Sequence, residues 1–372
     1  MSVQLYPLRN GLKEIEEKVI HSQRLSFEDG VTLFNSPELL DVGYLSNIVR
    51  ERKNGNNAYF INNRHINHTN ICINRCRFCA FSKDKGEEGA YTMTIEDVLK
   101  SAREYGVDLA DSGRVSEFHI VGGLHPDLPF QYYLNMMDAL HREYPDVHIQ
   151  AFTAVEIEYL SRIAGLSIKD TLIKLREAGL GSLPGGGAEI FAEGVRNKVC
   201  PEKISGERWL NVHRIAHQIG MRSNATMLYG HIETIEDRVD HLIKLRGLQD
   251  ETGGFMSFIP LAFHPKNTEL DSLSKTTGNL DLRVLAVSRL MLDNFPHIKA
   301  FWIMIGPKLA QISLSFGVDD IDGTVVEERI THSAGAETGQ SLSRDELVKM
   351  IREAGRVPVE RDTLYKSLNG SS

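Results

Sequence analysis

The sequence predicts an α/β fold, a closed (β/α)8 barrel of the TIM type with helical additions at its N- and C-terminal ends. The main observation is that short β-rich segments alternate about eight times with amphipathic helical segments between residues 58 and 320. Such alternation is typical of a parallel sheet covered by helices, and eight units favour a closed barrel over an open sheet. In addition, no repeat, low-complexity run or linker interrupts the sequence, so we expect residues 1–372 to form a single domain.

Within this domain we expect N-terminal helices over residues 1–57, the barrel over residues 58–320 and a helical extension over residues 321–372. The expected strands are residues 58–62, 118–123, 148–154, 180–186, 222–230, 255–263, 298–306 and 312–318. The helical segments after the first six of them are residues 94–106, 130–145, 168–179, 208–220, 235–249 and 280–296, and a last helix covers residues 344–355.

Local signals support the ends of several helices. Ser26 with Asp29 has the spacing of a capping box, in which a side-chain oxygen and an acidic residue three positions later satisfy the first backbone N–H groups of a helix. Glycine is favoured just past helix C-termini, where the backbone turns left-handed. Glycines stand at three such places: Gly106, Gly179 and Gly220. Ser343 with Glu346 forms a second capping box, at the start of the C-terminal helix.

The composition is that of an ordinary soluble protein, with 41% hydrophobic and 25% charged residues. The net charge of −8 argues against a nucleic-acid partner, which needs a basic surface. No apolar run approaches the roughly 18 residues that span a bilayer, and the N-terminus lacks the apolar segment of a secretory signal. Three of the four cysteines lie within eight residues, which indicates metal chemistry in a reducing cytoplasm.

The metal motif is the triplet Cys72, Cys76 and Cys79, placed directly after the first barrel strand. Thiolates are soft ligands that suit zinc or an iron–sulfur cluster. A structural zinc site would need a fourth ligand, which His65 or His68 could supply. Three cysteines without a fourth leave one iron of a [4Fe–4S] cluster open to a small molecule. Cys200, far along the chain, is expected to be a buried free thiol.

Polar residues crowd the expected carboxyl ends of the strands, where barrel enzymes place their chemistry. They are His125, Thr153, Glu156, Pro184–Glu189, Tyr229, His231, Glu233, His264, Lys266, Asp319 and Asp320. Thr153 and Glu156 have two readings with equal support, a capping box and a ligand-binding pair. The run Pro184–Gly187 is able to form a nest of backbone N–H groups for an anion.

The cysteine triplet, with the aromatic Phe78 before its last member, resembles the signature of the radical S-adenosylmethionine (SAM) superfamily. The resemblance implies a radical SAM barrel whose cofactors are a [4Fe–4S] cluster, held by the three cysteines, and SAM, bound at the open iron. It also implies that Gly122 and Gly123 hold the SAM methionine through main chain, although a tight turn explains two glycines as well. Further SAM contacts implied are Phe78, Thr153, Glu156, Gly186 and Glu189.

Segments along residues 40–366 resemble the aminodeoxyfutalosine synthase family of menaquinone biosynthesis, among them PGGGAEIF, TMLYGHIE and FIPLAFH. The resemblance implies that the adenosyl radical adds to 3-[(1-carboxyvinyl)oxy]benzoate and that rearrangement and decarboxylation give 6-amino-6-deoxyfutalosine. An electron donor such as flavodoxin or ferredoxin is implied as a partner. The catalytic candidates are His231, His264, Asp319 and Asp320. Further candidates for binding the substrate carboxylates are His125, Lys266 and Lys308.

Two alternatives stay open at this point. The relatives cyclic dehypoxanthinylfutalosine synthase and the subunits of the deazaflavin (FO) synthase share the cysteine motif and the barrel, so the substrate could differ. A protein of another class, which binds zinc or a cluster without catalysis, is the remaining alternative.

Overall fold

The computed structural model describes residues 11–103 and 115–368. The helices are α1 Lys13–Ile20, α2 Phe27–Asn35, α3 Leu39–Asn54, α4 Ile95–Arg103, α5 Phe130–Glu143, α6 Ala154–Ala164, α7 Ile168–Glu177, α8 Glu193–Val199, α9 Gly206–Gln218, α10 Ile235–Thr252, α11 Gly278–Met291, α12 Trp302–Ile305, α13 Pro307–Ser313, α14 Ile330–Ser333 and α15 Arg344–Glu353. The strands are β1 Asn57–Ile61, β2 Asn63–Ile66, β3 Glu117–Ile120, β4 His148–Ala151, β5 Ser182–Leu183, β6 Arg222–Tyr229, β7 Phe255–Ala262, β8 His297–Ile298, β9 Asp320–Gly323 and β10 Val357–Glu360.

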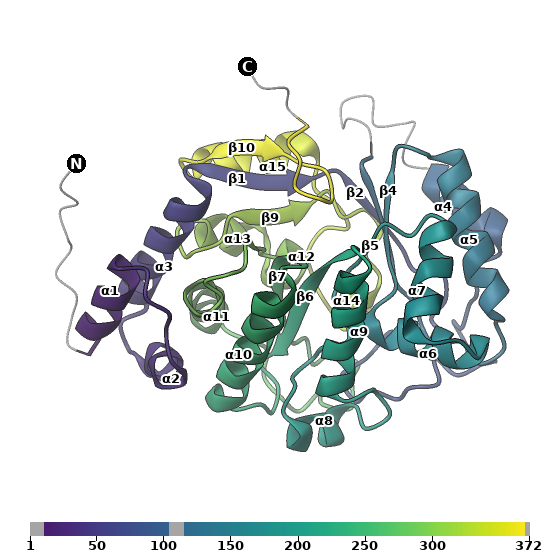
Figure 1. Cartoon of the computed structure of the whole chain (residues 1–372), viewed down its shortest axis with the longest axis horizontal. Helices are drawn as coiled ribbons and strands as arrows, with labels where there is room; N and C mark the ends of the chain where they lie inside the picture. The colour runs from purple at the N-terminus through teal and green to yellow at the C-terminus, as the bar shows by residue number, and fades with distance from the viewer. Residues whose placement is uncertain (1–10, 104–114, 369–372) are drawn as a thin grey trace.

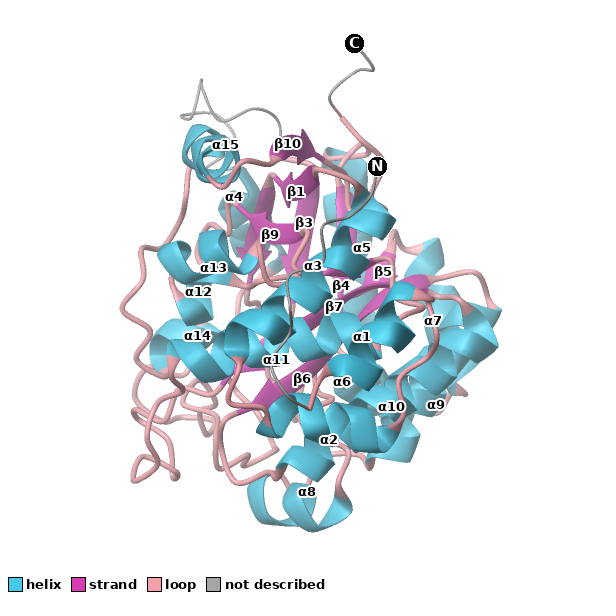
Figure 2. Ribbon diagram, turned by 90° about the vertical axis from the view of Figure 1, so that its left-hand side faces the viewer, coloured by secondary structure: helices cyan, strands magenta, loops and turns pink. Residues whose placement is uncertain are grey.

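Seven strands form one curled parallel sheet in the order β2-β3-β4-β5-β6-β7-β8, which confirms the predicted α/β barrel class. The segment of β9 lies between the two ends of this sheet. Asp320 bridges to Lys299 just after β8, and Val326 bridges to Arg64 of β2, both in parallel. Helices surround the strands (Figure 2), because their apolar faces pack on the outer side of the sheet.

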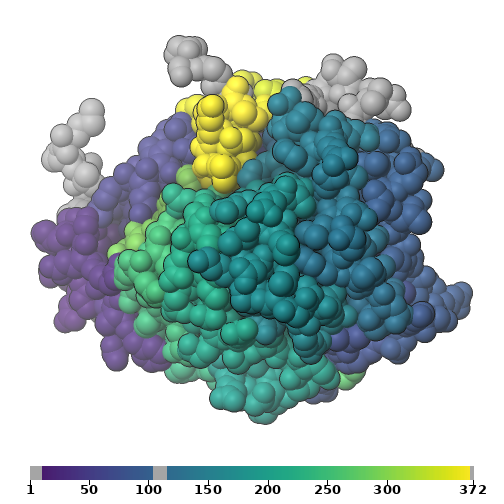
Figure 3. Space-filling view, turned by 45° about the vertical axis from the view of Figure 1, so that its right-hand side comes forward, coloured from purple at the N-terminus to yellow at the C-terminus, as the bar shows by residue number. Residues whose placement is uncertain are grey.

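A smaller parallel sheet, β10-β1-β9, adjoins the barrel, and its strands lie together along one edge of the molecule (Figure 1). Its order joins distant parts of the chain, since β1 pairs with β10 from Asn57↔Val357 to Phe60↔Glu360. In the space-filling view, C-terminal residues in yellow lie against residues of the first half of the chain (Figure 3). The predicted C-terminal extension therefore contains a strand, β10, in addition to its helix.

The capping boxes Ser26–Asp29 and Ser343–Glu346 are both present at the starts of α2 and α15. Gly179 and Gly220 follow the ends of α7 and α9 with positive φ, as expected. Gly106 lies outside the described residues. Within the described part of the chain, every helix is too short or too polar to cross a lipid bilayer.

Two strand predictions near the end of the barrel are wrong. In the segment 298–306 only Ile298 belongs to a strand, and Trp302–Ile305 forms α12. The segment 312–318 begins in α13 and continues as a turn, while the true strand is β9. Leu314, Phe316 and Val318 of this segment are buried and so mimic a strand in sequence, whereas Ile312 is exposed.

Candidate functional site

A cavity of about 320 Å³ opens inside the barrel at the carboxyl ends of the strands. Its lining brings together most of the residues predicted from the sequence. They are Cys72, Cys76, Phe78, Cys79, Gly122, Gly123, Thr153, Glu156, Gly186, Glu189 and His264. Apolar walls complete it, among them Leu228, Ile259, Leu261, Phe301 and Met304.

The cysteine loop follows β2 and is held by backbone hydrogen bonds to neighbouring loops. The N–H of Cys72 donates to Lys83 O at 3.1 Å, and the N–H of Ile73 donates to Leu124 O at 3.0 Å. A tight turn, in which the Cys79 N–H donates to Cys76 O at 2.9 Å, brings the last two cysteines together. All three thiols are free and line the same cavity, so the loop offers three soft ligands to one bound group.

This donor set fits a [4Fe–4S] cluster. Burial raises the pKa of Cys72 and Cys76, so thiolates at these positions need a bound cation to compensate them. Among the described residues, no three His, Cys, Asp or Glu side chains are arranged to hold a single metal ion. A cluster instead binds each thiolate through a different iron, so its ligands surround a volume.

The two histidines that a zinc site would need, His65 and His68, are both buried. The ring of His65 stacks on that of His119 with centroids 4.4 Å apart. His68 is fully buried and packs against Gly122, where a Cβ atom would lie 2.5 Å from its ring. Among the residues that the structure describes, neither histidine joins the cysteines in a group that could hold a metal ion.

The glycines after β3 are required by close packing. A Cβ atom on Gly123 would lie 2.2 Å from the carbonyl oxygen of Ile71, in the loop that carries Cys72. Their N–H groups are occupied, because Gly122 donates to Glu156 Oε1 at 3.0 Å and Gly123 donates to Thr69 O at 2.9 Å. The turn thus fixes the cysteine loop and faces the cavity beside it.

Thr153 and Glu156 form a capping box at the start of α6, which is one of the two roles predicted for them. Both residues also line the cavity. Burial raises the pKa of Glu156 to about 7, although N–H groups of Thr153 and Gly122 donate to its carboxylate and favour its charged form.

The glycine-rich turn after β5 approaches β6 closely. A Cβ atom on Gly185 would lie 2.2 Å from Asn224 O, and Gly185 and Gly187 have φ of 84° and 83°. Glu189, which follows, is itself left-handed with φ of 48° and is held by the Leu228 N–H, which donates to its carbonyl at 2.8 Å. The turn can hold this conformation because its glycines carry no side chain.

Lys203 is a cavity residue that the sequence did not reveal. Its ammonium forms a buried ion pair with Glu189 and lies 5.0 Å from the ring centroid of Phe78. The pKa of Lys203 is raised, because the opposing charges of Cys76 and Glu189 outweigh burial. A cation therefore stands beside the cysteine loop, on a segment that shares no motif with it.

Of the predicted histidines, His264 lines the cavity and His231 does not. Nε2 of His264 lies 2.9 Å from Met304 O, so the neutral ring donates there, while its Nδ1 is buried and without a partner. His231 is buried behind the strand end, with Nδ1 3.2 Å from Glu233 Oε2. His125 also lies outside the cavity lining and accepts the Asp127 N–H.

Lys266 and Lys308 are exposed side chains that do not line the cavity. Glu233, near His231, accepts N–H groups of Gly230 and His231 and pairs with Arg238 at 2.7 Å. These contacts order the turn after β6.

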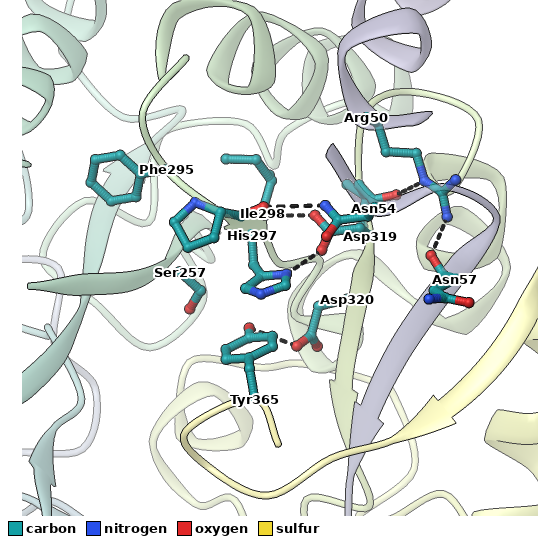
Figure 4. Close-up of polar contacts among 12 residues, drawn as sticks. Arg50, Asn54, Asn57, Ser257, Phe295, His297, Ile298, Asp319, Asp320 and Tyr365 are labelled. Atoms are coloured by element: carbon teal, nitrogen blue, oxygen red, sulfur yellow. Dashed lines mark hydrogen bonds and ion pairs between the residues drawn. The ribbon is translucent and has the colours of Figure 1, made fainter. Parts of the chain in front are cut away.

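The prediction that Asp319 and Asp320 lie at the rim of the site is wrong, because they precede or begin β9 instead of following a strand. Both are fully buried outside the cavity lining. Asp319 pairs with Arg289 and His297, and Asp320 accepts the Tyr365 hydroxyl at 2.7 Å. Figure 4 shows Asp319 beside His297 and Asp320 beside Tyr365. Buried charges are found in proteins when they are paired, so these carboxylates belong to a network of ion pairs at the opposite end of the barrel.

Comparisons with known proteins agree with this geometry. Residues 66–245 match the radical SAM superfamily, and residues 252–371 match the CofH/MqnC C-terminal region. The chain is 51% identical over 359 residues to aminodeoxyfutalosine synthase of Thermus thermophilus (95% of each chain). It is 45% identical over 370 residues to the synthase of Streptomyces coelicolor (96% of this chain, 94% of the other).

More distant relatives share the architecture. A 5-amino-6-(D-ribitylamino)uracil–L-tyrosine 4-hydroxyphenyl transferase of Methanopyrus kandleri is 43% identical over 317 residues, 84% of this chain and 85% of the other. The crystal structure of methylornithine synthase superposes with a TM-score of 0.70 at 19% identity, over 92% of this chain and 97% of the other, and shows the same fold. Radical SAM enzymes use a [4Fe–4S] cluster and SAM, which the three cavity cysteines suit. With about half of its residues shared with such synthases along nearly its whole length, this chain belongs to the aminodeoxyfutalosine synthase family of radical SAM enzymes.

Proposed function

We propose that this protein is an aminodeoxyfutalosine synthase. It would join the 5′-deoxyadenosyl group of SAM to 3-[(1-carboxyvinyl)oxy]benzoate and, after rearrangement and decarboxylation, release 6-amino-6-deoxyfutalosine and methionine. The observation that carries the proposal is that Cys72, Cys76 and Cys79 share one barrel cavity with Glu189 and Lys203, in a chain about half identical to synthases of this name. When bound, the cluster and SAM supply the electron and the adenosyl radical.

Residues that line the cavity would position SAM and exclude water. Phe78, Gly122, Gly123, Gly186 and Glu189 surround the cysteine end of the cavity and would position SAM there. Thr153 and Glu156 would shape the same end from the start of α6. The apolar walls would exclude water and other hydrogen donors, and so favour addition of the radical over its quenching.

His264 is the residue we propose as the acid–base group. Its Nε2–H is committed to Met304 O, which leaves Nδ1 as an acceptor, and burial lowers the ring's pKa so that it is neutral near pH 7. A neutral imidazole with one free acceptor suits removal of a proton from a rearranged intermediate. His231 would not contact the substrate and would act as a positioning residue, through the turn after β6. We further propose that the protein works in the reducing cytoplasm, where free thiols stay reduced. We also propose flavodoxin or ferredoxin as its electron donor.

The fate of the adenosyl group tests the proposal. The cluster-loaded protein is given SAM labelled in its adenosine moiety, an electron donor and 3-[(1-carboxyvinyl)oxy]benzoate, without oxygen. We expect the label in a product that retains the benzoate ring, with methionine released about one for one. Label recovered almost wholly as 5′-deoxyadenosine would contradict addition and favour hydrogen abstraction, as in the cyclisation of dehypoxanthinylfutalosine. A reaction without the aromatic substrate is the control.

A further inference from the structure

The floor of the cavity is polar where barrel interiors are ordinarily filled by branched apolar side chains. Below the cysteine loop, strand residues supply its charged and polar groups: His65, Glu117, His119, Gln150, Lys299 and Asp322. We name these six residues the cavity floor. They come from β2, β3, β4, β9 and the residue after β8, and Glu117 is the first residue of its strand. The cavity therefore runs from the cysteine loop at the carboxyl ends of the strands deep into the barrel.

One member of the floor lacks a partner. His65 is only 7% exposed, and its buried Nε2 atom makes no hydrogen bond. Its ring stacks on that of His119 with centroids 4.4 Å apart and is nearly parallel to that of Phe301, whose centroid is 6.3 Å away. A buried polar atom without a partner costs free energy, so a ring nitrogen at a cavity wall that donates in the Nε2–H tautomer indicates a ligand that accepts from it.

A cation stands in the same floor. Lys299 is buried, and its Nζ lies 3.0 Å from Asp322 Oδ1. An ammonium has three donors, and Asp322 takes one of them. Among the described residues that line the cavity, the only lysines or arginines are Lys299 and Lys203, and Lys203 is paired with Glu189 beside the cysteines. The cavity thus carries one lysine–carboxylate ion pair at each end.

We propose that the cavity floor binds the ring carboxylate of an aromatic substrate, which accepts hydrogen bonds from Lys299 Nζ and His65 Nε2 while the ring lies near Phe301. This inference rests on the proposed function. The reacting vinyl group must reach the cysteine end, so a carboxylate on the far side of the ring points toward the floor. A carboxylate buried there needs a cation and donors, which these two residues supply.

The test compares two ligands that differ only at the ring. One is 3-[(1-carboxyvinyl)oxy]benzoate, and the other is 2-phenoxyacrylate, which lacks the ring carboxylate. Binding of each to the cluster-loaded protein is measured by calorimetry, and kcat/KM is measured where turnover occurs. The main variant is Lys299→Met with Asp322→Asn, which removes both charges of the pair and leaves neither alone. Lys349→Met, at an exposed lysine of α15 outside the cavity, is the matched control.

We expect the paired variant to bind the benzoate roughly 10- to 100-fold more weakly and the phenoxy compound nearly unchanged, so that the preference for the carboxylate collapses. His65→Leu, which leaves no charge behind, should reduce the same preference by up to about tenfold. Iron content and the circular dichroism spectrum show whether each variant is folded. If folded variants at both positions keep the full preference, the inference is wrong. If the wild type forms labelled product and the folded variants keep the full preference, the inference alone is overturned. If the variants lose the preference but the wild type forms no addition product, the proposed function alone is overturned.

Discussion

Glu156 joins the start of α6 to the turn after β3, because its Oε1 accepts the N–H of Gly122 at 3.0 Å while its Oε2 accepts the N–H of Thr153 at 2.7 Å. The residue is 5% exposed, so this junction is made by a carboxylate in the interior. The same turn presses on the cysteine loop through Gly123. One side chain thus connects a helix, a strand end and the loop that carries the metal ligands.

The stability contributed by Glu156 should depend on pH. Burial raises its pKa from 4.5 to about 7 in the folded protein, so the folded state binds the proton more tightly than the unfolded chain. Stability therefore falls as the pH rises from about 4.5 to about 7. In Glu156→Gln this component is lost, and the stability of the variant relative to the wild type should improve across the same window. Urea unfolding on both sides of the window measures it, with the exposed Glu236→Gln as control. A constant difference at all pH values would contradict the prediction.

The cysteines of the loop should be individually indispensable. Replacing Cys72, Cys76 or Cys79 with Ala leaves a second iron without a protein ligand, so iron and sulfide content and activity should both be lost. Cys200, buried beside Cys76 in the same apolar cluster, is the matched control. Cys200→Ala should retain most of the iron and most of the activity. Loss of the cluster in that variant would overturn the three-ligand site.

Glu189 should matter for SAM and not for the cluster. Glu189→Gln removes the charge that pairs with Lys203, and hydrogen bonds to charged groups are worth roughly 1.5–3 kcal/mol. We expect SAM to bind roughly tenfold or more weakly by calorimetry, with iron content unchanged. Glu193→Gln, an exposed carboxylate in the first turn of α8, is the control. Unchanged SAM affinity in Glu189→Gln would remove Glu189 from the site.

Gly247 offers a stabilising substitution. It lies inside α10, and a Cβ atom built on it would meet nothing within 4 Å. Gly247→Ala should raise the free energy of unfolding by about 1 kcal/mol, because alanine loses less backbone entropy in a helix. Gly253, the left-handed C-cap of the same helix with φ of 60°, is the opposite case. Gly253→Ala should destabilise the protein, and thermal unfolding of both variants shows whether the signs differ as expected.

The sequence predicted the elements whose signals are local. The apolar run of β7 and the capping boxes of α2 and α15 depend on neighbouring residues, and the structure confirms them. The cysteine triplet is local as well. Strand β9 was missed because its sequence, DIDG, is polar, and the partner of Asp320, Arg361, comes 41 positions later.

Site residues that depend on long-range contacts could not be predicted from the sequence either. Lys203 and Lys299 face the cavity only because the barrel brings their segments to the cysteine loop, and neither belongs to a recognisable motif. Asp319 and Asp320 were placed at the site because the strand before them was assigned to the wrong segment. Their true partners, Arg289 and Tyr365, are defined by tertiary structure alone.

The pairing of β1 with β10 sets the order in which a nascent chain can mature. Asn57 meets Val357 three hundred positions later (357 − 57), so the small sheet stays open until nearly all of this chain has left the ribosome. Closing so long a loop carries an entropic cost that local helices do not bear. During synthesis β1 therefore presents an unpaired edge, which is a site for aggregation until β10 arrives.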